Sequence, residues 1–322
     1  NIDANYIDEV IIGCVLQAGQ GQAPGRQAAL AAGIPNSVPV TTINKMCGSG
    51  MKALMFGHDL IKAGSISTAL CGGIESMSNA PYLLPRARQG YRLGHDKIID
   101  HMFLDGLEDP YNKGKLMGVF AEATAEKYNF SREDQDDFSK TSLKRALNAQ
   151  ENGAFNNEIV TITVKTRKSE TIVAQDEGPD LNKLEKISRL KPAFKKDGTV
   201  TAANSSSISD GASSLIIMNY KTAKTLNLTP LAKISGHSSF AHEPEWFTTA
   251  PFFAIKKLLQ KLSWHKDEID LFEINEAFAV VTMAAMQDLE LDHNKVNING
   301  GACALGHPIG ASVARIVTTL VH

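Results

Sequence analysis

The stretch DEVIIGCVLQAGQGQAPGRQAALAAGIPNSVPVTTI, residues 8–43, contains two apolar segments separated by an alanine-rich one. Residues 8–16 and 37–43 have the β-branched runs typical of buried strands, and residues 25–33 have the composition of a helix. A strand, a helix and a second strand in this order form a βαβ unit, in which the two strands are parallel. The stretch therefore predicts a parallel sheet covered by helices, as in α/β proteins.

The alternation of strands and helices continues for one more round after this unit. The helical spacing of residues 49–64 ends at a glycine, and residues 67–73 form another buried apolar run. Within residues 77–207 the alternation lapses, because proline, glycine and charged residues dominate around one amphipathic helix. The start of that helix, SRED at 131–134, has the pattern of a capping box. We therefore expect this part of the chain to be an inserted loop domain.

Strand patterns return after the loop domain. They occur at residues 213–218, 231–238 and 269–274, and a helical segment at 252–262 separates the last two. A second α/β half is therefore expected from about residue 229. The predicted domains are an N-terminal α/β half at 1–76 continued by 208–228, the loop domain at 77–207, and a C-terminal α/β half at 229–322.

Composition and charge exclude several functional classes. The 322 residues are 43% hydrophobic and 21% charged, which is enough for a sizeable core, and the net charge of −2 leaves no basic excess for nucleic acid. No apolar run approaches the roughly 20 residues of a membrane span, and the first residues lack the pattern of a signal peptide. The four cysteines contain no CxxC pair that would indicate a zinc site. We expect a cytoplasmic protein without nucleic-acid, membrane or metal partners.

Cys47 lies in the segment NKMCGSGMKA, residues 44–53, between a predicted strand and a predicted helix. Gly48 and the glycine two positions after it remove bulk beside the thiol, and the N–H groups of a helix start stabilise a thiolate or an oxyanion. Most buried cysteines are inert packing residues, and we interpret Cys14 and Cys71, inside apolar strand patterns, in that way. Cys47 is therefore predicted to be a nucleophile.

Two later turns carry the polar groups that a nucleophile requires. NEAFA at 275–279 follows a buried strand, and NGGACALGHPIGASVAR at 299–315 opens the last helix. Turns at the carboxyl ends of strands are where α/β proteins bind ligands, so the two turns and the cysteine turn would converge on one site. Alternatively, Asn275 caps the helix that it precedes, and His307 is a surface residue that caps a helix with Pro308 in its first turn. Spacing alone leaves both interpretations open.

Five segments of the chain resemble the signature segments of the thiolase family, and specifically of acetyl-CoA C-acetyltransferases. These segments occur in the family's order and extend across nearly the whole chain. They are NKMCGSGMKA, GGIESMSNAPY, GTVTAANSSSISDGA, EINEAFA and NGGACALGHPIGASVAR. The resemblance implies a thiolase-like α/β fold. Such a fold has two βαβα-type halves with mixed, mostly parallel sheets covered by helices, plus an inserted loop domain.

The resemblance also implies roles for individual residues. Cys47 would be the nucleophile that takes the acyl group, and His307 the base that activates its thiol and later the attacking thiol of coenzyme A. Asn275 would hold a water that contributes, with His307, to an oxyanion hole for the acetyl-CoA enolate. A neutral imidazole needs a contact that fixes its tautomer, from Glu276 or from a backbone carbonyl. Ser206 would lie beside the pantetheine of coenzyme A. The implied apolar walls of that pocket are Leu107, Met117, Phe194, Ala202, Phe247, Ala277 and Phe278.

The implied reaction interconverts two acetyl-CoA with acetoacetyl-CoA and free CoA. It proceeds in ping-pong order through an acetyl-cysteine, as a Claisen condensation or, in reverse, a thiolysis. The three CoA compounds would be substrates, so neither a cofactor nor a metal is implied. The keywords that follow are transferase, acyltransferase, lipid metabolism and fatty acid metabolism, and we expect a homo-oligomer, either a homodimer or a homotetramer.

The chain departs from the family pattern at both ends. Thiolases carry a second catalytic cysteine in a CxG segment beyond the GHP motif, and no such segment follows before His322. The family's first strand and helix are missing before Asn1. Cys303 precedes the histidine motif, at a position where relatives carry assorted apolar residues, and we interpret it as structural. We therefore expect a chain truncated at both ends, in which activity depends on the missing segments.

Three alternatives remain at this stage. Degradative 3-ketoacyl-CoA thiolases, which act on longer acyl chains, share the same core motifs. A truncated, inactive remnant of the thiolase fold would bind CoA without catalysis. A β-ketoacyl synthase also pairs a cysteine with a histidine, but it usually lacks the NEAF turn and the GHPIGAS context.

Overall fold

The computed structural model describes residues 2–165, 167 and 169–322. These residues form two units, each assembled from three separate pieces of the chain. The first unit contains Asn1–Met117, Ile208–Pro230 and Pro308–Arg315, and the second contains Gly118–Ser207, Leu231–His307 and Ile316–His322. The three-part domain division inferred from the sequence stays a prediction.

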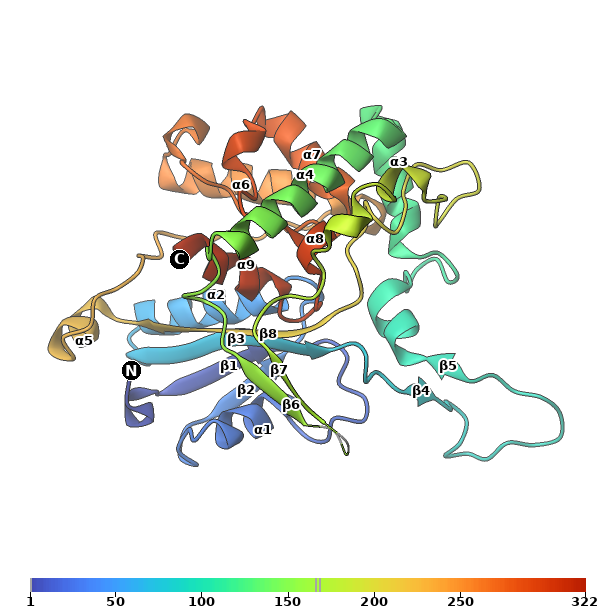
Figure 1. Cartoon of the computed structure of the whole chain (residues 1–322). Coiled ribbons are helices and arrows are strands. Elements are labelled where there is room, and N and C mark those ends of the chain that lie inside the picture. The colour runs from blue at the N-terminus through green and yellow to red at the C-terminus, as the bar shows by residue number, and fades with distance from the viewer. Residues whose placement is uncertain (1, 166, 168) are drawn as a thin grey trace. The chain divides into compact units, whose positions relative to one another are not determined.

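A four-stranded sheet forms the centre of the first unit (Figure 1). Its order is β2-β1-β3-β8. β1 (Glu9–Gly13) is parallel to β2 (Val40–Ile43) on one side and to β3 (Thr68–Ser76) on the other, whereas β8 (Asp210–Met218) is antiparallel to β3. The four strands predicted for this half of the chain are confirmed, and the sheet is mixed and mostly parallel as expected.

Two helices, α1 (Pro24–Ala31) and α2 (Ser49–Lys62), cover this sheet. A glycine of α1 packs against Ile12 of β1, and a glycine in the middle of α2 leaves room for the thiol of Cys71 in β3. Ile12 pairs with Gly72, the neighbour of Cys71, so the two contacted side chains point to opposite faces of the sheet. The helices therefore lie on opposite faces, as Figure 1 shows.

Short elements complete the first unit. They are η1 (Ala4–Tyr6), β4 (Tyr82–Leu83), β5 (Ile99–Asp100), the π-helix η2 (Phe103–Leu107) and α5 (Tyr220–Thr225).

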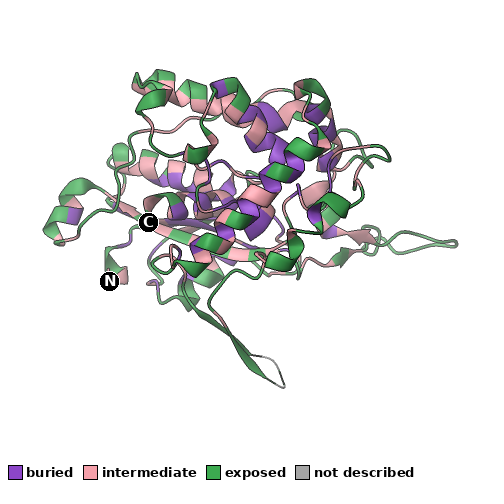
Figure 2. Cartoon of the chain, turned by 45° about the horizontal axis from the view of Figure 1, so that its top comes forward, coloured by how far each residue is buried: buried purple, intermediate pink, exposed green. Residues whose placement is uncertain are grey.

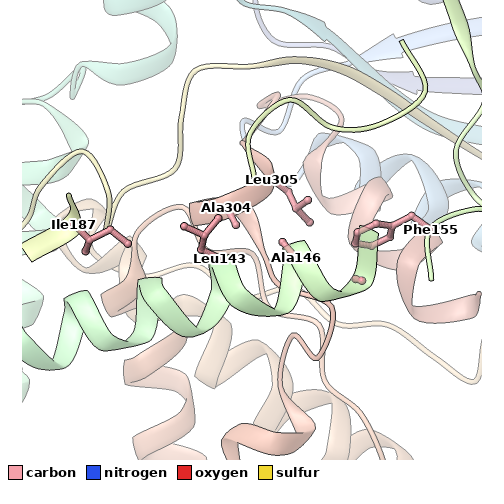
Figure 3. Close-up of a cluster of buried hydrophobic side chains, with 7 residues drawn as sticks. Leu143, Ala146, Phe155, Ile187, Ala304 and Leu305 are labelled. Carbon is pink, nitrogen blue, oxygen red and sulfur yellow. The ribbon is translucent and has the colours of Figure 1, made fainter. Parts of the chain in front are cut away.

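The second unit is built mainly from helices around α4 (Arg132–Glu151). The predicted capping box at the start of α4 is confirmed, because Ser131 Oγ accepts the Asp134 N–H at 3.1 Å and Asp134 Oδ2 accepts the Ser131 N–H at 2.8 Å. Apolar side chains of α4 pack against the short helix α8 (Ala302–Leu305), as Figure 3 shows. The buried side chains of this cluster are Leu143, Ala146, Ala149, Phe155, Ile187, Ala304 and Leu305.

The remaining helices and strands lie before, between and after α4 and α8 in the sequence. The strands of the hairpin formed by β6 (Ile162–Lys165) and β7 (Glu170–Val173) are almost entirely exposed (Figure 2). None of the helices in the described part of the chain is long and apolar enough to cross a lipid bilayer. The remaining bounds are α3 (Met117–Tyr128), η3 (Leu181–Lys183), η4 (Ile187–Arg189), η5 (Pro244–Thr249), α6 (Ala250–Leu262), η6 (Lys266–Glu268), α7 (Ala279–Leu289), η7 (His293–Lys295) and α9 (Ser312–Val321).

The strands predicted at 231–238 and 269–274 do not join a sheet among the described residues. Only Phe272 forms a parallel bridge, with Val296. The backbone N–H of Ile274 instead donates to the side chain of Asn297 at 2.8 Å. An apolar pattern does not identify the hydrogen-bond partner of a segment, so two extended loops, one mostly exposed at 231–238 and one partly buried at 269–274, were predicted as strands. The helix predicted at 252–262 is confirmed as α6.

Candidate active site

Cys47 lies in the tight connection between β2 and α2, in the first unit. Gly48 is the residue at the N-terminal cap of α2. The hydroxyl of Ser49 accepts the Lys45 N–H at 2.8 Å and donates to the Met46 carbonyl at 2.6 Å. This bridge holds Met46 at a φ of 48°, in the left-handed region that costs a non-glycine residue free energy. The strand-to-helix junction predicted for the cysteine is therefore present.

The thiol of Cys47 packs beside a buried apolar cluster of Val15, Leu16, Met77 and Ile309. Burial is the main cause that raises the pKa of this thiol to about 11, and the negative charge of Glu75 raises it further. A hydrogen bond with the backbone N–H of Cys47 itself lowers the pKa, but by less than burial raises it. The helix start therefore does not lower the pKa below its usual value, contrary to the argument from sequence. The thiol carries its proton at neutral pH.

Glu75, at the end of β3, is a buried carboxylate that the sequence analysis did not identify. It is 5% exposed and accepts three backbone N–H groups, from Val15 at 3.1 Å, Leu16 at 3.0 Å and Gly310 at 2.9 Å. The carboxylate thereby ties the segment after β1 to the piece of chain that precedes α9. A glutamate directly after the apolar run TALCGGI was the available signal, because a buried charge needs compensating donors.

Cys14 and Cys71 are fully buried in the first unit. Burial, with a contribution from a nearby carboxylate in each case, raises the pKa of both thiols to about 12. Cys14 directly follows β1 and Cys71 lies within β3, and both positions fit the interpretation of these cysteines as packing residues.

Asn275 and His307 lie together in the second unit. The Asn275 Nδ2 atom is 3.5 Å from the His307 Nε2 atom, although 32 positions separate the residues in sequence. His307 is only 7% exposed, and its backbone N–H donates to the Ser207 carbonyl at 3.1 Å. The N-terminal cap of α7 is Phe278, and His307 lies between α8 and α9. The alternatives of a capping asparagine and a surface histidine are therefore wrong.

Most residues implied for the coenzyme A pocket lie in the same unit as Asn275. The backbone N–H and the hydroxyl of Ser206 both donate to the Ala277 carbonyl, each at 3.0 Å. The rings of Phe194 and Phe278 meet edge to face with their centres 5.9 Å apart. Phe247 packs in the same manner on another phenylalanine of the unit, at 6.4 Å. The structure thus brings the NSSS and NEAF segments into direct contact.

The remaining implied pocket residues are less enclosed. Ala202 is exposed in the second unit. Leu107, the last residue of η2, and Met117, the first residue of α3, belong to the first unit and are half-buried.

Cys303 lies on α8 with a half-buried side chain. Its backbone N–H donates to Glu276 Oε2 at 3.1 Å, and its sulfur is 3.8 Å from the Glu276 carbonyl oxygen. Burial, followed by the Glu276 charge, raises the pKa of this thiol well above its usual value. These contacts fit the structural interpretation of Cys303.

Comparison with known proteins gives one consistent family. Residues 1–221 match the family model of the thiolase N-terminal domain, and residues 228–322 match that of the thiolase C-terminal domain. A probable acetyl-CoA acyltransferase of Staphylococcus aureus (strain bovine RF122 / ET3-1) is 48% identical over 323 residues, covering 100% of this chain and 82% of the relative.

Solved structures agree with these matches. The crystal structure of the Bacillus anthracis acetyl-CoA acetyltransferase superposes with a TM-score of 0.96 at 42% identity, covering 100% of this chain and 81% of that one. The Acat5 thiolase from Ascaris suum, in complex with coenzyme A, gives a TM-score of 0.94 at 41% identity, with coverages of 100% and 82%. The predicted fold class is therefore confirmed.

Proposed function

The chain belongs to the thiolase family, and on this basis we propose that it is an acetyl-CoA C-acetyltransferase, which interconverts two acetyl-CoA with acetoacetyl-CoA and CoA. The name of one similar structure, an acetyl-CoA acetyltransferase, supports the acetyl substrate. The name of the similar sequence, a probable acetyl-CoA acyltransferase, fits any length of acyl chain. The observation that carries the proposal is the 3.5 Å approach of Asn275 Nδ2 to His307 Nε2. It supplies a basic nitrogen and an amide donor at one place, as acyl transfer and enolate stabilisation require.

In the first half-reaction, the sulfur of Cys47 attacks the thioester carbonyl of acetyl-CoA. Because burial raises the pKa of the thiol to about 11, a base must take its proton at neutral pH, and we assign this role to His307. The bond between the carbonyl carbon and the CoA sulfur breaks. His307 then returns the proton to the departing CoA thiolate, which leaves acetylated Cys47.

In the second half-reaction, a base removes a proton from the methyl group of a second acetyl-CoA. The enolate carbon attacks the acetyl group on Cys47, and the Cys47 thiolate leaves and regains a proton. We assign to Asn275 and His307 the water that stabilises the enolate oxygen, since donors fixed before the reaction lower the barrier most. Thiolysis follows the same steps in reverse.

We assign the pantetheine of CoA to Ser206 and to the apolar side chains around it, including Phe194 and Phe278. The edge-to-face contact of these two rings supplies a rigid apolar wall. The CoA thioesters are substrates, and side chains alone supply the acid and base groups of the scheme, so the proposal includes no cofactor or metal. A cytoplasmic homodimer or homotetramer acting in lipid metabolism completes the proposal.

Steady-state thiolysis of two substrates tests the acyl specificity. We expect kcat/KM for acetoacetyl-CoA to exceed that for 3-ketodecanoyl-CoA by at least about 10-fold, because a pocket sized for acetyl excludes a longer chain. Cys47→Ala should be inactive with both substrates and serves as the control. A preference for the longer substrate would assign the chain to the degradative 3-ketoacyl-CoA thiolases instead.

A further inference from the structure

Glu276, directly after Asn275, has a carboxylate that is buried and held by three donors. The residue is 1% exposed. Its Oε2 atom accepts the Ser142 hydroxyl at 2.7 Å and the Cys303 N–H at 3.1 Å. Its Oε1 atom accepts the Asn297 side-chain amide at 2.9 Å. A buried carboxylate that accepts hydrogen bonds from this set of donors holds its neighbours in fixed positions.

The contacts of Asn297 extend this network to the residue before Asn275. The Asn297 side chain accepts the Ile274 N–H and donates to the Ile274 carbonyl, both at 2.8 Å. Arg145 of α4 in turn donates to the Val296 carbonyl at 2.7 Å. The turn that presents Asn275 is therefore held on one side through Ile274 and on the other through the Glu276 carboxylate.

The contacts of Ser142 extend the network toward His307. The Ser142 oxygen that donates to Glu276 also accepts the Gly301 N–H at 2.9 Å, at the start of α8. A Cβ atom on Gly301 would lie 2.2 Å from the Glu276 carboxyl carbon, so glycine is needed for this approach. α8 also packs on α4 through apolar side chains (Figure 3) and ends two residues before His307.

We propose that Glu276 is a positioning residue that joins the turn carrying Asn275 to the α8 segment carrying His307. Through Asn297 and Ser142, its carboxylate sets the 3.5 Å separation of the Asn275 and His307 side chains. The effect of this positioning on the reaction rests on the function proposed above. Displacing a catalytic group by about 1 Å can cost about 100-fold in rate. Both the proton transfer by His307 during acetylation and the later use of the water shared with Asn275 therefore depend on this network.

Glu276→Gln tests the proposal, because it keeps the shape of the side chain but presents an N–H group where a donor now approaches. The rate of CoA release in the first turnover with acetyl-CoA is measured over a range of acetyl-CoA concentrations. We expect the maximal rate to fall by about 10- to 100-fold, with little change in the half-saturating concentration. An unchanged maximal rate would overturn the proposal.

Two serines of α4 provide a matched pair of further variants. Ser142 and Ser139 are each 2% exposed and lie about one helical turn apart. The hydroxyl of Ser139 donates to the Gln135 carbonyl of its own helix and contacts the Cys303 thiol, but it forms no hydrogen bond with the Glu276 carboxylate. We expect Ser142→Ala to slow acetylation, with little additional loss when combined with Glu276→Gln, whereas Ser139→Ala keeps the wild-type rate. Equal losses in the two serine variants would indicate general loosening of α4 and overturn the proposal.

Hydrogen–deuterium exchange separates this inference from the proposed function. In Glu276→Gln, we expect faster amide exchange in both the 272–277 and the 299–307 peptides, and wild-type exchange in the first unit. If the wild-type chain is not acetylated by acetyl-CoA, the proposed function fails while this measurement still tests the network. Unchanged exchange of the 299–307 peptide in the variant would overturn the positioning role.

Discussion

Cys47 lies at a helix start, a position that lowers the pKa of many cysteine thiols, yet burial raises its pKa to about 11. Glu75 contributes to this increase, because a nearby negative charge disfavours the thiolate. Below pH 11 the thiolate fraction is therefore smaller than for an exposed cysteine. The residue gains nucleophilicity only when a base removes the proton.

Glu75→Gln is expected to lower the pKa of Cys47, because the variant removes a negative charge near the thiol. The rate of Cys47 alkylation by iodoacetamide, followed by peptide mass spectrometry across pH, should reach its half-maximum at a lower pH than in the wild type. Glu122→Gln, a change at a buried glutamate of the second unit, should leave that midpoint unchanged. A midpoint that stays at the wild-type value in Glu75→Gln would show that the Glu75 charge does not act on Cys47.

Substitutions of His307 and Asn275 should separate the two half-reactions. His307→Asn removes the proposed base, so brief labelling with radioactive acetyl-CoA should leave Cys47 without label. Asn275→Ala should keep the acetylation and slow acetoacetyl-CoA formation by on the order of 10²–10³, the usual cost of losing an oxyanion-hole donor. Peptide mapping locates the label. Equal labelling of wild type and His307→Asn, or label on Cys14, would contradict these roles.

At the scale of elements, the contact between α8 and the NEAF turn depends on a glycine. Gly301→Ala would place a Cβ atom 2.2 Å from the Glu276 carboxyl carbon, so the carboxylate or α8 must move. We expect the free energy of unfolding, measured with urea, to fall by about 1–3 kcal/mol. Gly236→Ala is the control, because its Cβ would meet only the ends of two leucine side chains, the nearer at 3.1 Å. Similar losses in both variants would show that the Glu276 contact is not the cause.

Sequence patterns within a short segment correctly predicted the strands and helix caps that depend on interactions within that segment. The strands of the first unit and the capping box at Ser131 follow from short patterns, so they were predicted correctly. The segment 269–274 was wrongly predicted as a strand, because the side chain of Asn297, 23 positions after Ile274, takes up the backbone groups that a neighbouring strand would bind.

Partners far apart in sequence explain why part of the candidate site was missed. Glu75 binds Gly310 across 235 positions, and Glu276 binds Ser142 across 134 positions. No spacing rule within one segment reports such pairs. Asn275 and His307 were found because each lies in a distinctive motif, but only the fold shows that they approach each other.

For the whole molecule, CoA binding should appear as added stability. A ligand that binds only the folded state raises the free energy of unfolding by about 2.7 kcal/mol at 100 times its Kd. We therefore expect CoA to raise the Tm of the chain, and Phe194→Ala to reduce this increase by removing an apolar wall of the proposed pocket. ADP, which lacks pantetheine, is the control ligand. A Tm that CoA does not change would contradict CoA binding.

The division of each unit into three pieces has a consequence for biosynthesis. The first unit includes Pro308–Arg315, and the second includes a piece that begins only after Arg315, at Ile316. The ribosome must therefore synthesise most of the chain before either unit has all of its parts. Until β8 has emerged, the edge of β3 that β8 later covers has no partner strand from the first unit. A nascent chain with an open apolar edge is prone to aggregation, so chaperones that shield such edges would govern the yield of this protein in cells.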